Sequence, residues 1–157
     1  MKTHKRSRIL LLLLIGATLA FIWTRSMKSR AASAAESAAV MELLMPLLEL
    51  FVGGGNVTDH LVRKLAHFCE FGLLGVEVSA WLALRAGEKH RPLPPLAFGL
   101  TVAALDETIQ LFAAGRGCQL SDVALDFGGY VCGLGGLRLL LWLIRRFQDP
   151  MQQEHKQ

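Results

Sequence analysis

The chain has 157 residues, of which 52% are hydrophobic and only 19% are charged. This composition excludes an ordinary soluble domain, and the length fits one small membrane domain. Lysine and arginine outnumber aspartate and glutamate by 17 to 13. In so apolar a chain this excess indicates membrane topology rather than nucleic-acid binding, for which the sequence carries no motif.

Four apolar runs approach or reach the roughly 17 to 25 residues that cross a bilayer. They are Ile9–Trp23, Leu65–Leu84, Leu93–Phe112 and Val123–Ile144. The first is short and spans only if Arg8 and Arg25 extend toward the two surfaces. A cleaved signal peptide is the alternative for this run, because basic residues precede it and small residues follow at 31–35. Arg25, Lys28 and Arg30 stand between the run and those small residues, which argues against cleavage.

The segment between the first two runs contains a second kind of helix. After an Ala/Ser-rich stretch comes the apolar stretch Val40–Val52, in which Glu42 and Glu49 share one helical face with Pro46 between them as a kink. This pattern predicts an amphipathic helix on the outer membrane surface. A plain linker helix packed on the bundle is the alternative.

The predicted fold is therefore all-α, an integral membrane four-helix bundle with an extra amphipathic helix between the first and second spans. Residues 1–30 form the basic N-terminal segment and first span, 31–62 the extracytoplasmic linker, 63–146 the three-helix core and 147–157 a cytoplasmic tail. Most lysines and arginines outside the spans lie on one side if both chain ends are inside, which predicts that orientation. Prolines after the turn at 85–92 suit the first turn of the third membrane helix.

Polar side chains gather toward the outer ends of the last three spans. An ionisable group in hydrocarbon is costly, so these residues predict a functional or structural use. They are His67 and Glu70 at the start of the second span, Asp106, Glu107 and Gln110 at the end of the third, and Asp122 and Asp126 at the start of the fourth. A rise of about 1.5 Å per residue places the deeper acids within roughly 5 to 10 Å of the helix ends. The sequence predicts a shared pocket that faces outward.

One face of the fourth span carries small residues below the two aspartates. Asp122, Asp126, Gly129, Gly133 and Gly136 follow one another at helical spacings of four and three residues. Small residues let membrane helices approach closely, so this stripe is expected to press against a neighbour and bring the aspartates to it. For the glycines alone, simple helix packing is a sufficient explanation.

Several of these motifs, in order, resemble the VanZ-like family of bacterial membrane proteins. The resemblance runs from about Arg63 to Gly136. It rests on Lys64-Leu-Ala-His-Phe-Cys-Glu-Phe-Gly72, Asp106-Glu-Thr-Ile-Gln-Leu-Phe112, Gly115-Arg116, Ser121-Asp-Val123, Gly129 and Gly133. The family name derives from a factor associated with resistance to teicoplanin, a glycopeptide that acts on cell-wall precursors outside the membrane. The resemblance implies a multi-pass protein of the bacterial cytoplasmic (inner) membrane that affects the cell envelope or glycopeptide susceptibility.

The chemistry of the predicted pocket is mixed. Its candidate residues are Lys64, His67, Glu70, Asp106, Glu107, Gln110, Arg116, Asp122 and Asp126. The carboxylates and imidazole suit a divalent metal such as Mg, Mn or Zn, and Lys64 and Arg116 suit a phosphate. Together they favour a polyprenyl phosphate or lipid-linked cell-wall precursor as partner, beside membrane lipid. Internal ion pairing that only holds the bundle together explains the same residues.

No catalytic residue is assigned, because the sequence contains no metalloprotease, P-loop or nucleophile motif. Three classes of function stay open: an accessory protein that alters access to surface precursors, a membrane enzyme acting on a lipid-linked substrate, and a structural membrane protein without chemistry. Deeper in the spans, Glu77 and Arg138 lie at similar depth and are predicted to form a structural ion pair. Three cysteines without paired spacing imply free thiols.

Overall fold

The computed structural model describes residues 2–38, 40, 42, 58–85 and 92–154. Four long helices account for most of this part of the chain: α1 (Lys2–Ser26), α3 (Asp59–Ala83), α4 (Leu93–Gln110) and α5 (Leu120–Glu154). A shorter helix covers residues 30–38. The described residues contain helices, turns and loops but no strand, so the prediction of an all-α fold is confirmed for them.

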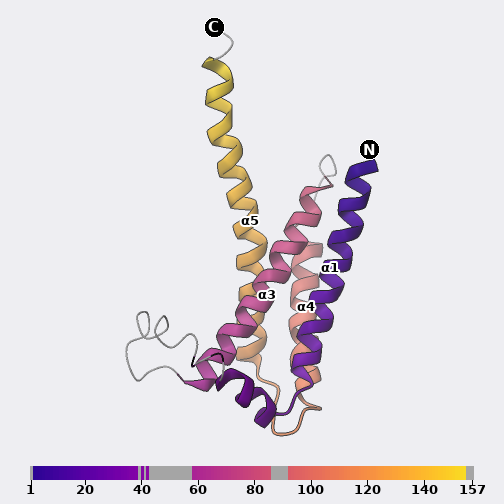
Figure 1. Ribbon diagram of the computed structural model, residues 1–157, viewed down its shortest axis with the longest axis vertical. Helices are drawn as coiled ribbons and strands as arrows, with labels where there is room; N and C mark the ends of the chain where they lie inside the picture. Colours follow the sequence, from indigo (N-terminus) through magenta and orange to yellow (C-terminus); the bar gives the residue numbers. More distant parts are fainter. Residues whose placement is uncertain (1, 39, 41, 43–57, 86–91, 155–157) are drawn as a thin grey trace.

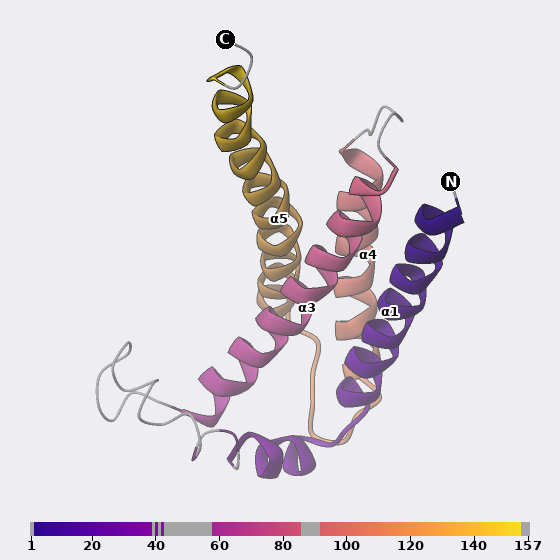
Figure 2. The same ribbon diagram turned by 45° about the horizontal axis from the view of Figure 1, so that its top comes forward.

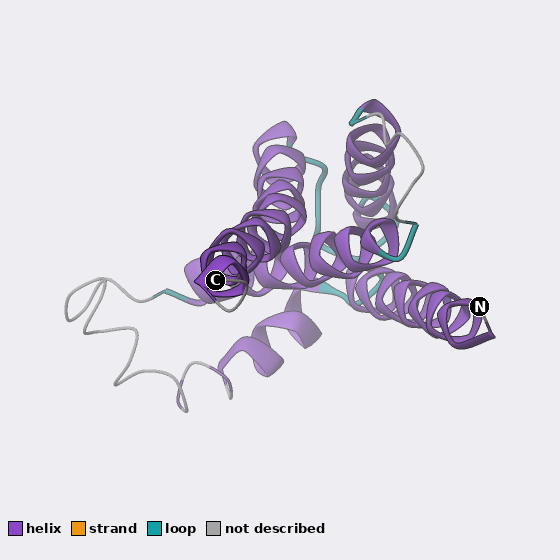
Figure 3. Ribbon diagram, turned by 90° about the horizontal axis from the view of Figure 1, so that it is seen from above, coloured by secondary structure: helices purple, strands orange, loops and turns teal. Residues whose placement is uncertain are grey.

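The four long helices lie side by side and alternate in direction (Figure 1). α3 packs chiefly on α5 and also on α1, and α4 fits between α1 and α5. The helix at 30–38 lies across the end of the bundle where α1 and α4 finish and α3 and α5 begin (Figure 2). The start of α1 and the end of α5 lie at the opposite end (Figure 1), and the view from above shows only helices and loops among the described residues (Figure 3).

Three helices are long and apolar enough to cross a membrane: Lys5–Ser26, Asp59–Ala83 and Leu120–Phe147. Their outward faces carry exposed apolar side chains such as Leu10 and Leu13, each 65% exposed, as lipid contact requires. α4 is not among the three, because its 18 residues include Asp106 and Glu107 besides two prolines. Both acidic side chains are buried against the other helices, so their polarity faces protein rather than lipid.

The helix ends follow local sequence signals. Thr58 caps α3, with its Oγ1 accepting a hydrogen bond from Leu61 N at 3.2 Å, and Asp59 occupies the first turn. α3 therefore begins at Asp59, earlier than the apolar run predicted. α4 begins after Pro92 with further prolines in its first turn, as expected from the sequence.

The predicted amphipathic helix at Val40–Val52 lies almost wholly outside the described residues. The structure instead adds a helix at 30–38, where the sequence analysis placed none. Alanine favours helix strongly, and Arg30 N donates to Ala114 O at 3.0 Å, which joins this helix to the loop after α4. Ser33 and Ser37 are buried on its inner face.

The closest contact between helices is the crossing of α3 and α5. A Cβ added at Gly129 would meet the Phe68 carbonyl oxygen, and one at Gly133 would meet the Gly72 carbonyl oxygen. Gly136, the third member of the predicted stripe, faces open space. The stripe thus makes a backbone contact at two of its three glycines, and Phe71, Leu74, Tyr130 and Leu134 fill the core beside it.

Gly133→Ala should destabilise the protein because the new methyl group would strike backbone that no side-chain rotation can relieve. We expect a loss of about 1–3 kcal/mol in the free energy of unfolding, as for overpacked cores. Gly136→Ala is the matched control and should be neutral or stabilising by up to about 1 kcal/mol through helix propensity. Denaturant titration of the purified proteins in detergent measures both, and equal stability of the two variants would contradict the close crossing.

Candidate functional site

Three ionisable side chains from three different helices meet at the end of the bundle nearest the helix at 30–38. His67 of α3 places Nδ1 3.8 Å from Asp106 Oδ2 of α4 and 3.9 Å from Asp126 Oδ2 of α5. One ligand atom from each of the three lies within 4.8 Å of the others. Asp106 is 0% and Asp126 1% exposed. The structure thus brings together three of the residues predicted from the sequence.

Asp106 is held by hydrogen bonds from two helices. Ser26 at the end of α1 donates its Oγ to Asp106 Oδ1 at 2.6 Å, and Gln110 Nε2 donates to Asp106 Oδ2 at 3.0 Å. Gln110 Nε2 also donates to Glu107 Oε1 at 2.8 Å, while Gln119 N donates to Glu107 Oε2 at 2.9 Å. These donors fix the orientation of both acids at the end of α4.

Ion pairs surround this centre. Arg25 of α1 contacts Glu70 at 3.1 Å and Glu36 of the short helix at 3.3 Å. Lys28 also pairs with Glu36, and this hydrogen bond, reinforced by the Lys28 and Arg25 charges, lowers the Glu36 pKa below its usual value. Two predicted pocket residues, Lys64 and Asp122, pair with each other at 2.8 Å.

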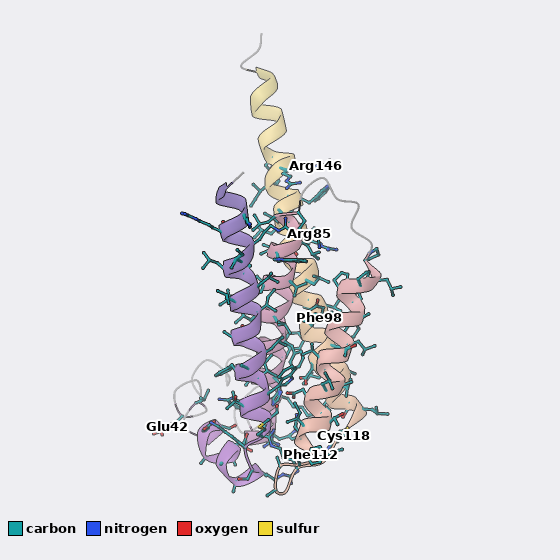
Figure 4. The ribbon with its side chains drawn as sticks, turned by 90° about the vertical axis from the view of Figure 1, so that its right-hand side faces the viewer. Glu42, Arg85, Phe98, Phe112, Cys118 and Arg146 are labelled. Carbon is teal, nitrogen blue, oxygen red and sulfur yellow. The ribbon has the colours of Figure 1, made fainter. Side chains whose placement is uncertain are left out.

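A polar recess opens beside the centre. It consists of two small adjoining cavities, of about 30 and 50 Å³, which share four lining residues. The lining includes the basic side chains of Arg30, His60, Arg63, Lys64 and Arg116, together with His67, Glu107, Gln110, Gly117, Gln119, Asp122, Leu125 and Asp126. Cys118 lies at this end of the molecule and Arg85 and Arg146 at the other (Figure 4).

Arg116 reaches the recess from the loop after α4. The loop turns through Gly115, whose φ of 76° is in the left-handed region that glycine adopts without strain. Burial lowers the Arg116 pKa, and the nearby Arg63 charge lowers it further. Its Nη1 atom is buried and has no hydrogen-bond partner among the described residues. The recess therefore concentrates positive charge, and Arg116 Nη1 is a hydrogen-bond donor that a bound anion could accept from.

Glu77 and Arg138 do not form the predicted ion pair. Thr18 of α1 donates its Oγ1 to Glu77 Oε1 at 2.8 Å, whereas Arg138 lines a separate cavity with Ser79, Leu82, Ala83, Leu141, Trp142 and Arg145. Within the described parts of α3 and α5 no ion pair joins the two residues. Similar depth along the two parallel helices α3 and α5 does not make their side chains face each other, and here Glu77 faces α1.

Sequence reasoning missed part of the site. Arg25 and Arg30 were interpreted as the basic flank of a short span and Glu36 as part of the linker, and Ser26 was not singled out. Their roles follow from how α1 and the short helix pack, which no local pattern reveals. His60 carried a usable signal, because it lies four and seven residues before Lys64 and His67 and thus on the same helical face.

The Arg25–Glu70 contact should couple α1 to α3. Arg25→Met and Glu70→Gln should each lower the free energy of unfolding, and the double variant should lose less than the sum. We expect a coupling of about 1–2 kcal/mol, between the values for exposed and buried pairs, since Arg25 is partly exposed. The control cycle pairs Glu70→Gln with Arg138→Met, which should be additive within about 0.5 kcal/mol. Additivity in the Arg25 cycle as well would contradict the contact.

The comparisons with known proteins agree with the motifs. Residues 9–143 match the family model described as VanZ/LLP1, which extends the resemblance from the core to α1 and most of α5. No curated protein and no solved structure matches the chain. The matched range contains His67, Asp106 and Asp126 as well as Arg25 and Ser26. The chain therefore belongs to the VanZ/LLP1 family.

Proposed function

We propose that the protein crosses a bacterial cytoplasmic membrane four times, with both chain ends inside and the polar recess facing outward. α4 runs antiparallel to α3 and α5 (Figure 2), and 18 helical residues extend about 27 Å, close to the hydrocarbon thickness. At the end opposite the recess, Arg85 stacks on Trp81 and Arg146 on Trp142, with guanidinium-to-ring distances of 4.8 and 5.4 Å. Aromatic and basic residues at one end are typical of a cytoplasmic interface.

The recess binds an anionic group at the outer surface, namely the phosphate of a lipid-linked cell-wall precursor or of a polyprenyl carrier. The observation that carries this proposal is the gathering of Arg30, Arg63 and Arg116 around one cavity, with Arg116 Nη1 buried and unpaired among the described residues. Guanidinium groups bind phosphate oxygens by paired hydrogen bonds. A protein that holds such a precursor at the membrane surface changes its access to glycopeptides of the teicoplanin type.

A membrane enzyme that acts on the same class of substrate is the second candidate. It is favoured by His67 and Asp126, which line the recess wall and are of the types that transfer protons or bind metals. The ion pairs Arg25–Glu70 and Lys64–Asp122 suit an accessory role in which the polar groups only join helices. The recess favours binding over a purely structural role, because joining helices gives no reason for the buried Arg116 Nη1 to lack a hydrogen-bond partner among the described residues.

Loss of the recess arginines should abolish any effect on the cell envelope. In bacteria that express the protein at matched membrane abundance, wild type should raise the minimum inhibitory concentration of teicoplanin. Arg63→Gln and Arg116→Gln should return it to the level of cells without the protein. Arg138→Gln, which removes a cation from the separate cavity, should protect like wild type. If all three variants protect cells as well as wild type does, the recess arginines are not needed for protection, which would contradict the proposal.

The proposed orientation predicts where thiol reagents reach the chain. Cys118 is exposed in the loop beside the recess, and Cys69 and Cys132 can be replaced by serine to leave it as the only thiol. A membrane-impermeant maleimide should label Cys118 in intact cells. A variant with Ser7→Cys as its only thiol should be labelled only after the membrane is opened. The reverse pattern would place the recess on the cytoplasmic side.

A further inference from the structure

We propose that His67, Asp106 and Asp126 bind a divalent transition-metal ion, zinc or manganese, in the wall of the polar recess. The three side chains come from α3, α4 and α5, so the site exists only when these helices are packed. This inference goes beyond phosphate binding by the arginines and stands or falls separately from it.

The spacing of the ligand atoms suits one ion. His67 Nδ1 lies 3.8 and 3.9 Å from the two carboxylate oxygens, too far for hydrogen bonds. Zinc bonds to nitrogen and oxygen are about 2.0–2.2 Å long, so two ligand atoms on one ion stand roughly 3 to 4 Å apart. The three atoms therefore face a common point at bonding distance after only small side-chain movements.

A second observation points to a cation at this place. Asp126 is 1% exposed, yet its Oδ2 has no hydrogen-bond partner among the described residues. Among the described residues neither Asp126 nor Asp106 forms an ion pair with a lysine or arginine, and the ionisable partner of both is His67. Glu70 and Asp122 differ, because Glu70 has Arg25 and Asp122 has Lys64. Two buried carboxylates beside one imidazole are costly without a positive charge between them.

The surroundings match those of a metal centre. Ser26 and Gln110 orient Asp106 from outside, as second-layer donors do around metal-bound carboxylates. One imidazole with two carboxylates favours Zn²⁺ or Mn²⁺ over Ca²⁺, which prefers oxygen alone. His67 and Asp126 also line the recess, so a further ligand position would open toward it. Such a position suits a water molecule or an anionic oxygen.

Zinc binding to the full-length protein in detergent tests the site. The protein carries serine at Cys69, Cys118 and Cys132 and no histidine tag, because thiols and tags bind zinc themselves. After EDTA treatment and its removal, Zn²⁺ titration against a competing chelator should give one site per chain. Asp126→Asn and His67→Gln should weaken binding at least about 100-fold and Ser26→Ala about 10- to 100-fold, as outer-layer changes do. Glu77→Gln, at a buried acid that Thr18 binds away from the recess, is the acidic control and should bind like wild type.

Thermal unfolding separates a metal ligand from a merely structural acid. In EDTA, Asp126→Asn should melt at or above the wild-type temperature, because the change removes one of two adjacent carboxylates. With Zn²⁺ the wild type should gain stability and this variant should not. X-ray absorption of zinc-loaded protein with wild-type site residues should show one histidine nitrogen and carboxylate oxygens. The proposal is overturned if folded protein binds no zinc, if the ligand variants bind as tightly, or if the zinc shell lacks histidine.

Discussion

The site depends on the near-contact of two backbones where α5 crosses α3. Gly129 lies against the Phe68 carbonyl and Gly133 against that of Gly72, so the helices approach as closely as their main chains permit. Phe68 follows His67 directly, and Gly129 lies about one turn after Asp126. The crossing therefore sets the register in which imidazole and carboxylate face each other. A larger residue in place of Gly129 or Gly133 would separate α3 from α5. It would thereby move His67 away from Asp126 without changing either residue.

α4 carries the buried acids Asp106 and Glu107, and both of its ends are fixed by polar contacts. At one end Asp106 and Glu107 are bonded to Ser26, Gln110 and Gln119. Toward the other end the buried Tyr130 donates its hydroxyl to Pro95 O at 2.9 Å, and its ring fills the space left by Gly99. These contacts give polar groups of α4 the hydrogen-bond partners that lipid could not supply.

The sequence predicted the helical class, four spans of which three are helices long and apolar enough to cross a membrane, and the convergence of His67, Asp106 and Asp126. These features follow from run length and from helical phase, which are local properties. It did not predict that Ser26 and Arg25 complete the cluster, because their partners depend on how α1 packs. Glu77 shows the same limit, because its bond to Thr18 depends on the rotation of α3. The helix at 30–38 did carry local signals: Ser29 Oγ accepts a hydrogen bond from Ala32 N at 3.3 Å, and alanine favours helix.

The order of the three central residues along the chain has a consequence for biosynthesis. If all four long helices cross the membrane, as proposed, a ribosome delivers α1, α3 and α4 before Asp126 is made, so Asp106 and Glu107 would enter hydrocarbon before the helix that encloses them. Only the last helix supplies the glycines and Tyr130 that close the bundle. Stable insertion of α4 should therefore wait for α5. The two helices then behave as one hairpin during translocation, and a nascent chain that stalls between them exposes its acids to the insertion machinery.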